Sequence, residues 1–176
     1  MKCIFELGGY MKKLFMIGGT MGVGKTTISQ KLCQELDCSV FLDGDWCWDM
    51  HPFVVNDETK LMVMKNITYQ LNQFIHCSVI ENIVFCWVMH EQTIINEILS
   101  EIDLTECEVY AISLICSKDS LKTRIEKDIR EGIRKKDVLD RSLERLDMYK
   151  MLDTMKIETT NLSVEETVEA IKEATR

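Results

Sequence analysis

"GGTMGVGKTT", residues 18–27, is the stretch that decides the fold of this chain. It contains the pattern G-x-x-x-x-G-K-[ST] from Gly19 to Thr26, in which successive backbone N–H groups cradle phosphate groups. Glycines let the backbone curl without Cβ clashes, and the N-terminus of the following helix adds partial positive charge. The expected nucleotide-binding residues of this loop are Gly19, Thr20, Met21, Gly22, Val23, Gly24, Lys25, Thr26 and Thr27.

Two residues of this loop have further expected roles. Lys25 is expected to reach the β- and γ-phosphates as a catalytic residue, and the Thr26 hydroxyl is expected to coordinate Mg²⁺. ATP and Mg²⁺ are therefore the predicted cofactors. A chance glycine-rich turn would explain the pattern without any ligand, but an apolar run before the loop and a helical pattern after it match the context that the motif requires.

Apolar runs of strand length alternate with helical patterns along the chain. The runs "KLFMIGG", "SVFLD", "NIVFCWVM", "VYAISLIC" and "MKIETT" predict five strands. Between them, Asn56 is the expected N-cap of a long amphipathic helix, and the capping box from Ser163 to Glu166 opens a last one. Strands that are apolar on both faces indicate a parallel sheet covered on both sides. We expect an α/β fold, a three-layer α/β/α sandwich around a mostly parallel five-stranded sheet.

Length and composition indicate one globular domain. The chain has 176 residues, of which 46% are hydrophobic; we expect a single domain over residues 11–176 and a poorly ordered extension over residues 1–10. Eight cysteines lie scattered without a C-x-x-C pair, as in a reduced cytoplasmic protein. No apolar run approaches the roughly 20 residues of a membrane span. The sequence therefore predicts a cytoplasmic protein without a membrane contact, either a monomer or a homodimer.

Charge is distributed unevenly along the chain. The net charge of -8 argues against a nucleic-acid partner, because phosphate backbones need a basic face. Residues 118–150 nevertheless contain 11 Lys and Arg against 8 Asp and Glu. A solvated helix with i,i+4 ion pairs would account for this segment. The concentration of five of the six arginines there suggests a second use, because arginine binds phosphate bidentately.

Two acids follow the second predicted strand. In "LDGD", Asp43 and Asp45 stand at the end of an apolar run, where a carboxylate can orient an attacking hydroxyl and accept its proton during phosphoryl transfer. Asp45 is the expected base, and Asp43 the expected Mg²⁺ contact. A turn around Gly44, in which the acids cap the next element, would explain both residues without catalysis.

From Met11 onward, these motifs and their order resemble the small P-loop kinases of the nucleoside, shikimate and gluconate kinase group, together with related antibiotic phosphotransferases. The resemblance implies a P-loop NTPase fold with Asp43 beside Mg²⁺ and Asp45 on the acceptor hydroxyl. Gluconate kinase-like members also read D-G-D, followed shortly by His-Pro. Here His51-Pro52 follows an inserted "WCWDM", and the third predicted strand ends without an acid, so the acceptor's identity does not carry over.

The same resemblance implies a mobile helical lid over approximately residues 124–140, with Gly132 bending the segment between two helical halves. Arg124 would stack on the adenine, and Arg130 or Arg134 would move onto the transferring phosphate as a catalytic residue. The post-lid pattern R-x-x-x-Y, from Arg145 to Tyr149, would hold the acceptor. Two further residues are expected to contact ligands. Arg141 lies one helical turn before Arg145 and is also expected to bind the acceptor, and Asn161 is expected to lie beside the adenine.

Aromatic residues and a histidine follow the second predicted strand or stand at the end of the third. Trp46, Trp48, Trp87 and His90 are the expected lining of an acceptor pocket, although the aromatics could equally cover the core beneath a loop. The predicted function is transfer of the γ-phosphate of ATP to a hydroxyl of a small molecule. An ATP-binding or ATP-hydrolysing regulatory protein that contacts a protein partner through its tryptophan-rich loop is the alternative, and an ATP hydrolase that remodels its target is another.

Overall fold

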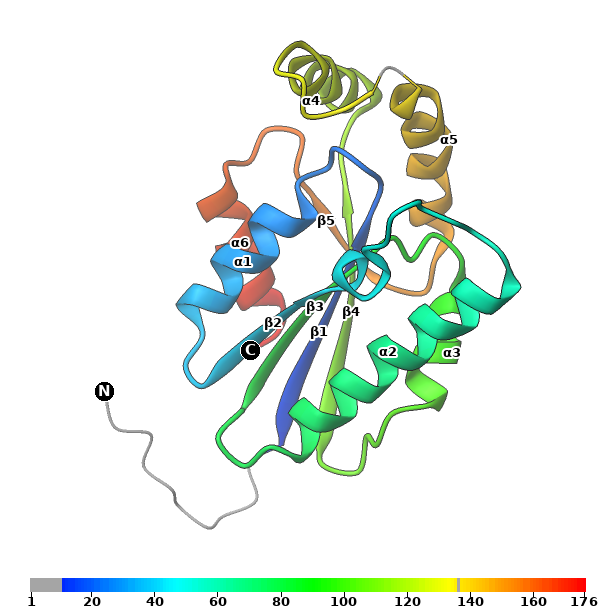
Figure 1. Ribbon diagram of the computed structural model, residues 1–176. Coiled ribbons are helices and arrows are strands. Elements are labelled where there is room, and N and C mark those ends of the chain that lie inside the picture. The colour runs from blue at the N-terminus through cyan, green and yellow to red at the C-terminus, as the bar shows by residue number, and fades with distance from the viewer. Residues whose placement is uncertain (1–10, 136) are drawn as a thin grey trace.

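The computed structural model describes residues 11–135 and 137–176 (Figure 1). The extension expected over residues 1–10 lies outside the described residues. The elements are, in chain order, β1 (Lys12–Gly19), α1 (Lys25–Glu35), β2 (Ser39–Asp43), the 3-10 helix η1 (Gly44–Trp48), α2 (Asp57–His76), β3 (Asn82–Cys86), α3 (Gln92–Ser100), β4 (Cys107–Ile115), α4 (Lys118–Arg130), α5 (Val138–Met151), β5 (Met155–Glu158) and α6 (Val164–Ala174).

The five strands form one sheet in the order β2-β3-β1-β4-β5, and every neighbouring pair is parallel. The predicted α/β sandwich is therefore confirmed. The chain leaves β1 toward one edge of the sheet and later fills the other edge through β4 and β5. In open α/β sheets, ligands bind outside the carboxyl ends of the strands near such a reversal, and the phosphate-binding loop follows β1 at this point.

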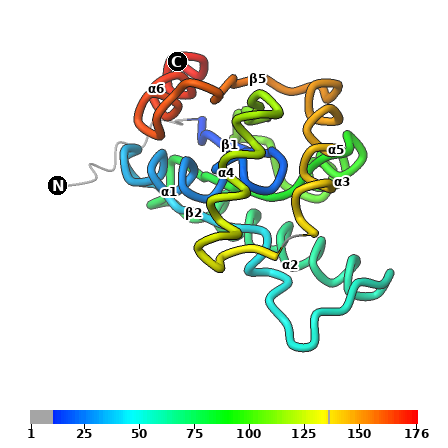
Figure 2. Tube along the Cα trace, turned by 90° about the horizontal axis from the view of Figure 1, so that it is seen from above, coloured from blue at the N-terminus to red at the C-terminus, as the bar shows by residue number. Residues whose placement is uncertain are grey.

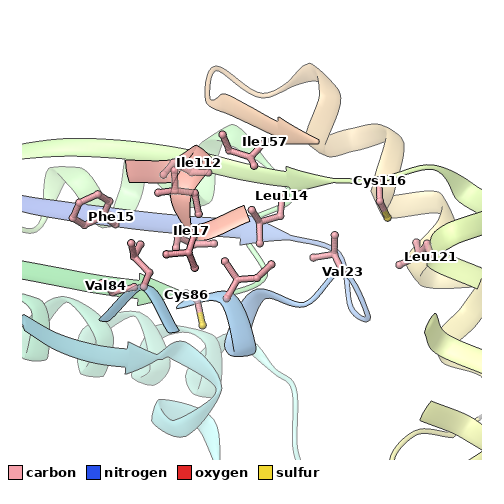
Figure 3. Close-up of a cluster of buried hydrophobic side chains, with 14 of the residues drawn as sticks. Phe15, Ile17, Val23, Val84, Cys86, Ile112, Leu114, Cys116, Leu121 and Ile157 are labelled. Carbon is pink, nitrogen blue, oxygen red and sulfur yellow. The ribbon is translucent and has the colours of Figure 1, made fainter. Parts of the chain in front are cut away.

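Two apolar clusters hold the layers together, because successive side chains of a strand point to opposite faces. Leu14 and Met16 of β1 belong to the cluster under α2 and α3. Phe15 and Ile17 belong to the cluster under α1 and α6 (Figure 3). All four side chains are at most 2% exposed, and full burial of each such side chain contributes about 1.5–3 kcal/mol. The alternation along β1 thus fixes which helices cover which face.

Local capping signals set several helix ends. The Asn56 side chain accepts a hydrogen bond from the Thr59 amide, whose hydroxyl in turn accepts from the Asn56 amide, at the start of α2. The predicted Ser163 to Glu166 capping box opens α6 in the same reciprocal way. Both expected caps are confirmed, and each satisfies amides that the first helical turn leaves without intrahelical partners.

The charged segment forms two separate helices. Gly132 has φ 73°, and the Gly132 and Ile133 amides donate to the carbonyls of Ile129 and Asp128, which is the Schellman arrangement that ends a helix. The bend expected at Gly132 is therefore the end of α4, and α5 starts after a short loop. Seen from above, α4 and α5 lie over the carboxyl ends of the strands (Figure 2).

The segment between η1 and α2 extends away from the sheet (Figure 2). It carries exposed apolar side chains, including Phe53 at 64% and Val55 at 55% exposure. No helix in the described ranges combines the length and apolar character needed to cross a membrane.

Candidate active site

The loop between β1 and α1 has the backbone geometry that its glycines predict. Gly22 and Gly24 lie in the left-handed region, with φ of 83° and 104°. Gly24 is also the N-cap of α1 and supplies no side-chain hydrogen bond. The first amides of α1 are therefore open to an anionic ligand, which the positive end of the helix dipole favours.

Both helices of the charged segment brace this loop. A Cβ on Gly22 would lie 2.5 Å from the Ile125 Cγ1 atom of α4, so a larger residue at this position would have to displace α4. On the other side, the buried Thr20 hydroxyl donates to the Ser142 carbonyl of α5 at 2.8 Å. The loop conformation thus depends on helices that follow it by more than 90 residues in the sequence.

Arg124 joins the loop to the end of β5. Its Nη1 donates to the Val23 carbonyl at 3.2 Å, and its Nη2 donates to the Thr159 carbonyl at 2.6 Å. Asn161 follows two residues later and is exposed. The structure therefore brings Arg124 and Asn161, both expected beside the adenine, to the same side of the phosphate-binding loop. Stacking of Arg124 on a base stays a prediction.

Lys25 lies at the centre of the candidate site. Its Nζ donates to the Thr20 carbonyl at 3.1 Å, so the ammonium group folds back over the loop. Burial lowers the pKa of Lys25, while the carboxylates of Asp45 and Asp43 act in the opposite direction. A desolvated ammonium group that faces a row of open amides is a suitable partner for phosphate oxygens.

Thr26 and Asp43 bring hydroxyl and carboxylate oxygens together. Thr26 Oγ1 donates to Asp43 Oδ2 at 2.9 Å, and Asp43 Oδ1 accepts from the Asp45 amide at 3.0 Å. Within the described ranges, no group of three or more His, Cys, Asp and Glu side chains could hold a metal ion alone. Mg²⁺ usually takes one or two carboxylates and completes its shell with phosphate oxygens and waters. The oxygen pair of Thr26 and Asp43 fits that requirement.

β3 ends at Cys86 and supplies no acid at this position. Cys86 is buried and pairs with Asp43 in the sheet register. Burial, together with the Asp43 carboxylate, raises the pKa of Cys86 to about 12, so the thiol stays protonated near neutral pH. Asp43 consequently carries the negative charge beside Thr26.

Asp45 lies in η1 and is exposed as a residue, although its carboxyl group is partly withdrawn from water. The Trp87 indole Nε1 donates to Asp45 Oδ1 at 3.1 Å. Partial desolvation and the neighbouring Asp43 charge raise the pKa of Asp45, and Lys25, the Trp87 hydrogen bond and Arg134 oppose this rise. A carboxylate with a raised pKa beside a phosphate-binding loop has the properties of a general base.

Arg134 also faces this centre. Its charge lowers the pKa of both Lys25 and Asp45, which requires its guanidinium group to lie near both. Arg134 Nε donates to Asp128 Oδ2 at 2.7 Å, and this ion pair ties the loop after α4 to the helix itself. Arg130, in contrast, is exposed at the end of α4, and no side-chain hydrogen bond or ion pair among the described residues involves its guanidinium group.

The predicted acceptor residues of α5 lie in two environments. Arg141 is exposed and pairs with Asp137 at 3.2 Å. Arg145 is partly buried and close to His90, whose pKa is lowered first by burial and then by the Arg145 charge. Tyr149 is fully buried, and a Cβ on Gly18 would lie 3.3 Å from its ring. The structure thus groups Arg145 with His90 and places Arg141 at the surface.

The two tryptophans of η1 also differ. Trp46 is 59% exposed and meets the Phe41 ring edge-on. Trp48 is partly buried against the apolar cluster under α2 and contacts the Phe53 ring, with 5.3 Å between ring centroids. Trp46 is free to meet a ligand, whereas Trp48 covers the core. Binding of an acceptor by either residue stays a prediction.

Several residues of the site escaped sequence reasoning. Ser142 supports Thr20 through its backbone carbonyl, for which a sequence contains no signal. Asp128 binds Arg134 from six positions away, outside the usual helical spacing of ion pairs. Thr159 accepts from Arg124 and lies near the end of the predicted fifth strand "MKIETT", so its expected place near the carboxyl edge of the sheet was the one available clue.

Three comparisons with known proteins bear on this site. A family model described as an AAA domain matches residues 16–148. The search of curated proteins gives no match.

Solved structures of similar fold include a gluconokinase from Sinorhizobium meliloti 1021, with 15% identity, a TM-score of 0.65 and coverage of 94% of this chain and 97% of that one. The tunicamycin resistance protein of Deinococcus radiodurans has 15% identity and a TM-score of 0.68, with 93% and 95% coverage. Shikimate kinase from Acinetobacter baumannii, in complex with shikimate, has 17% identity and a TM-score of 0.61, with 95% and 94% coverage.

These structures share the arrangement of elements with this chain across nearly its whole length, and at such identities the likeness establishes the fold. The family match extends from β1 through α5, so it includes the phosphate-binding loop, Asp43, Asp45 and the arginine-rich segment. Because that match covers well over half of the chain, this protein belongs to the AAA domain family and has the fold of the small P-loop kinases.

Proposed function

We propose that this protein is a kinase that transfers the γ-phosphate of ATP to a hydroxyl group of a small molecule. The observation that carries the proposal is the place of Asp45 beside the phosphate-binding loop. Its amide donates to Asp43 Oδ1 at 3.0 Å, and Asp43 Oδ2 accepts from the Thr26 hydroxyl of that loop at 2.9 Å. Nucleotide binding alone requires Lys25, but it does not require a second carboxylate, Asp45, in addition to Asp43. A base beside the phosphate-binding loop is needed when an alcohol attacks the γ-phosphate.

ATP would occupy the loop from Gly19 to Thr27, with Arg124 and Asn161 beside the adenine. Thr26 and Asp43 would hold Mg²⁺, which supplies charge neutralisation on the phosphate oxygens. Lys25, already desolvated over the loop, would contact the β- and γ-phosphates. These residues bind and orient the nucleotide.

Asp45 would act on the acceptor. Its carboxylate accepts the proton of the attacking hydroxyl as a bond forms between the acceptor oxygen and the γ-phosphorus. The bond between that phosphorus and the bridging oxygen breaks at the same time, and ADP leaves with the electron pair. Positioning supplies most of the catalysis in such a reaction, and two tethers hold Asp45: its amide to Asp43 and its carboxylate to Trp87.

The acceptor would lie between η1, the end of β3 and α5. Its expected contacts are Trp46, Trp48, Trp87, His90, Arg141 and Arg145. Two of the structures compared above are a gluconokinase and a shikimate kinase, which supports a small hydroxylated acceptor for this chain.

Arg134 would act as part of a lid over approximately residues 124–140. Arg134→Ala is expected to lower kcat by about 10-fold to 100-fold while the Kd for ATP changes less than threefold. This loss lies at or below the lower end of the roughly 10²-fold to 10³-fold effect of removing a preorganised donor. The physical reason is that its guanidinium group stabilises charge that develops during transfer, and closing it on the site excludes water. Steady-state kinetics together with calorimetric titration of ATP measure both effects.

Lys127→Ala provides the matched control, since Lys127 lies on the exposed side of α4 and pairs with Glu131 at 3.9 Å. Arg130→Ala tests the other expected lid arginine. If Arg134→Ala and Arg130→Ala both turn over ATP like the wild type, the lid assignment is wrong.

The kinase proposal itself is tested by ADP release in the presence of sugar acids, polyols, nucleosides and antibiotics, with transfer confirmed by ³¹P NMR of the phosphorylated product. A compound that raises ADP release and becomes phosphorylated identifies the acceptor class. ATP turnover that no compound changes would instead favour a hydrolase.

A regulatory ATP-binding protein is the second candidate. Exposed apolar side chains favour it, namely Trp46 of η1 and Phe53 and Val55 of the segment that extends from the sheet, since exposed apolar surface can mark a contact with a protein partner. ATP binding without turnover, combined with a partner that Trp46→Ala and Phe53→Ala release, would support this candidate over the kinase.

A further inference from the structure

Trp87 is the first residue after β3 and lies beside the central strand. Its backbone amide donates to the Ile17 carbonyl of β1 at 3.2 Å, so its backbone is anchored to the sheet although β3 has ended. The indole group leaves the sheet at this point and reaches η1, where Nε1 donates to Asp45 Oδ1. A side chain attached to the rigid sheet therefore contacts a carboxylate on a short 3-10 helix.

Gly44 fixes the position of the indole ring. A Cβ on Gly44 would lie 2.5 Å from Trp87 Cγ and 2.6 Å from Cδ1, far closer than carbon atoms approach one another without covalent bonds. The ring thus packs directly against the backbone of the residue before Asp45. Gly44 is itself buried, and this contact holds one side of the ring while its N–H is directed at the carboxylate.

The two oxygens of Asp45 have different surroundings. Oδ1 accepts the indole hydrogen bond, whereas no hydrogen bond among the described residues involves Oδ2. The Asp45 amide is held separately by Asp43 Oδ1 at 3.0 Å. With its backbone and one oxygen fixed, the carboxylate has a single oxygen left for an acceptor hydroxyl.

We propose that Trp87 is a positioning residue for the base: its indole N–H holds Oδ1 of Asp45 so that Oδ2 faces the acceptor hydroxyl. This role rests on the proposed kinase function and differs from lining the acceptor pocket, because it acts through Asp45.

The test replaces the N–H while keeping the ring. Benzothienylalanine incorporated at position 87 has a sulfur atom in place of the indole N–H and nearly the same shape, and Trp87→Phe is a simpler companion. We expect kcat to fall about 10-fold with an unchanged KM for ATP, since a displaced catalytic group loses rate rather than nucleotide binding. The acidic limb of the pH profile should move to higher pH, because the base loses a hydrogen bond that stabilises its charged form.

Tyr69→Phe, a change to an exposed aromatic residue of α2, is the control for general effects of aromatic substitution. The double variant with Asp45→Asn tests whether Trp87 acts through the carboxylate: benzothienylalanine should then cause no further loss. A rise in the acceptor KM with unchanged kcat and an unchanged pH profile would contradict positioning and leave Trp87 as a pocket residue.

A measurement without any acceptor separates this inference from the kinase proposal. The Trp87 indole N–H can be followed by ¹H–¹⁵N NMR of the free protein labelled at tryptophan, with Trp87→Phe assigning the signal. Asp45→Ala should move this signal and speed its exchange with solvent, because the indole loses its acceptor, whereas Asp49→Ala should leave the signal in place. A signal that Asp45→Ala does not move would overturn the positioning role whatever the activity. If no compound in the screen is phosphorylated, the proposed function fails, even where the Trp87 indole signal responds to Asp45→Ala.

Discussion

Asp45→Asn is expected to lower kcat by about 10²-fold to 10⁴-fold, the range that general acid–base catalysis contributes, with the KM for ATP nearly unchanged. The amide has the shape of the carboxylate and can still meet the Trp87 indole N–H through its oxygen, so the fold of η1 is preserved. An amide cannot accept the proton of the attacking hydroxyl. Phosphoryl transfer to the acceptor found by the compound screen, measured at saturating ATP, checks this result.

The pH dependence of the wild type provides a second readout of Asp45. The base acts only when ionised, so the rate falls as pH drops through its pKa. Desolvation and Asp43 raise that pKa above the usual value of an aspartate, and we expect the acidic limb at a correspondingly higher pH. In Asp45→Asn this limb should disappear, since no group at that position titrates.

Asp49→Asn is the matched control, because Asp49 is an exposed carboxylate just after η1. It should retain wild-type kcat and the wild-type acidic limb. Equal turnover of Asp45→Asn and Asp49→Asn would remove Asp45 from the reaction and with it the observation on which the kinase proposal rests.

Lys25→Met is expected to reduce kcat/KM for ATP by about 10²-fold to 10³-fold, comparable to the loss of a preorganised donor at a developing negative charge. The methionine side chain has nearly the length of the lysine stem but brings no charge to the β- and γ-phosphates. ATP affinity should fall as well, since Lys25 contacts phosphates in the ground state and in the transition state. Calorimetric titration with ATP and steady-state kinetics measure the two losses.

Thermal unfolding distinguishes loss of chemistry from loss of structure in Lys25→Met. Burial lowers the pKa of Lys25, which means that burying the ammonium group destabilises the folded protein. Removing that charge should therefore leave the unfolding temperature without a marked decrease. Lys31→Met, on the same helix and paired with Glu35 at 3.3 Å, should keep full activity; an active Lys25→Met would refute nucleotide use by this loop.

The sequence by itself determined the parts of this protein that local spacing specifies. The glycine and lysine pattern from Gly19 to Thr26 predicted a strand, a phosphate-binding turn and a helix start, because only glycines adopt the required φ values easily. The apolar runs predicted the parallel sheet, and the caps at Asn56 and Ser163 predicted two helix starts. Asp43 and Asp45 stood out because they directly follow a buried strand.

Only the tertiary structure decided how distant residues meet at the site. The Trp87 hydrogen bond to Asp45 spans 42 positions, and the Thr20 contact with Ser142 spans 122. Both depend on the strand order β2-β3-β1-β4-β5, which places the end of β3 beside the end of β2 and lets α5 return to the phosphate-binding loop. Periodicity and motif spacing report neighbours along the chain, whereas these contacts arise from packing of elements across the sheet, for which no local pattern exists.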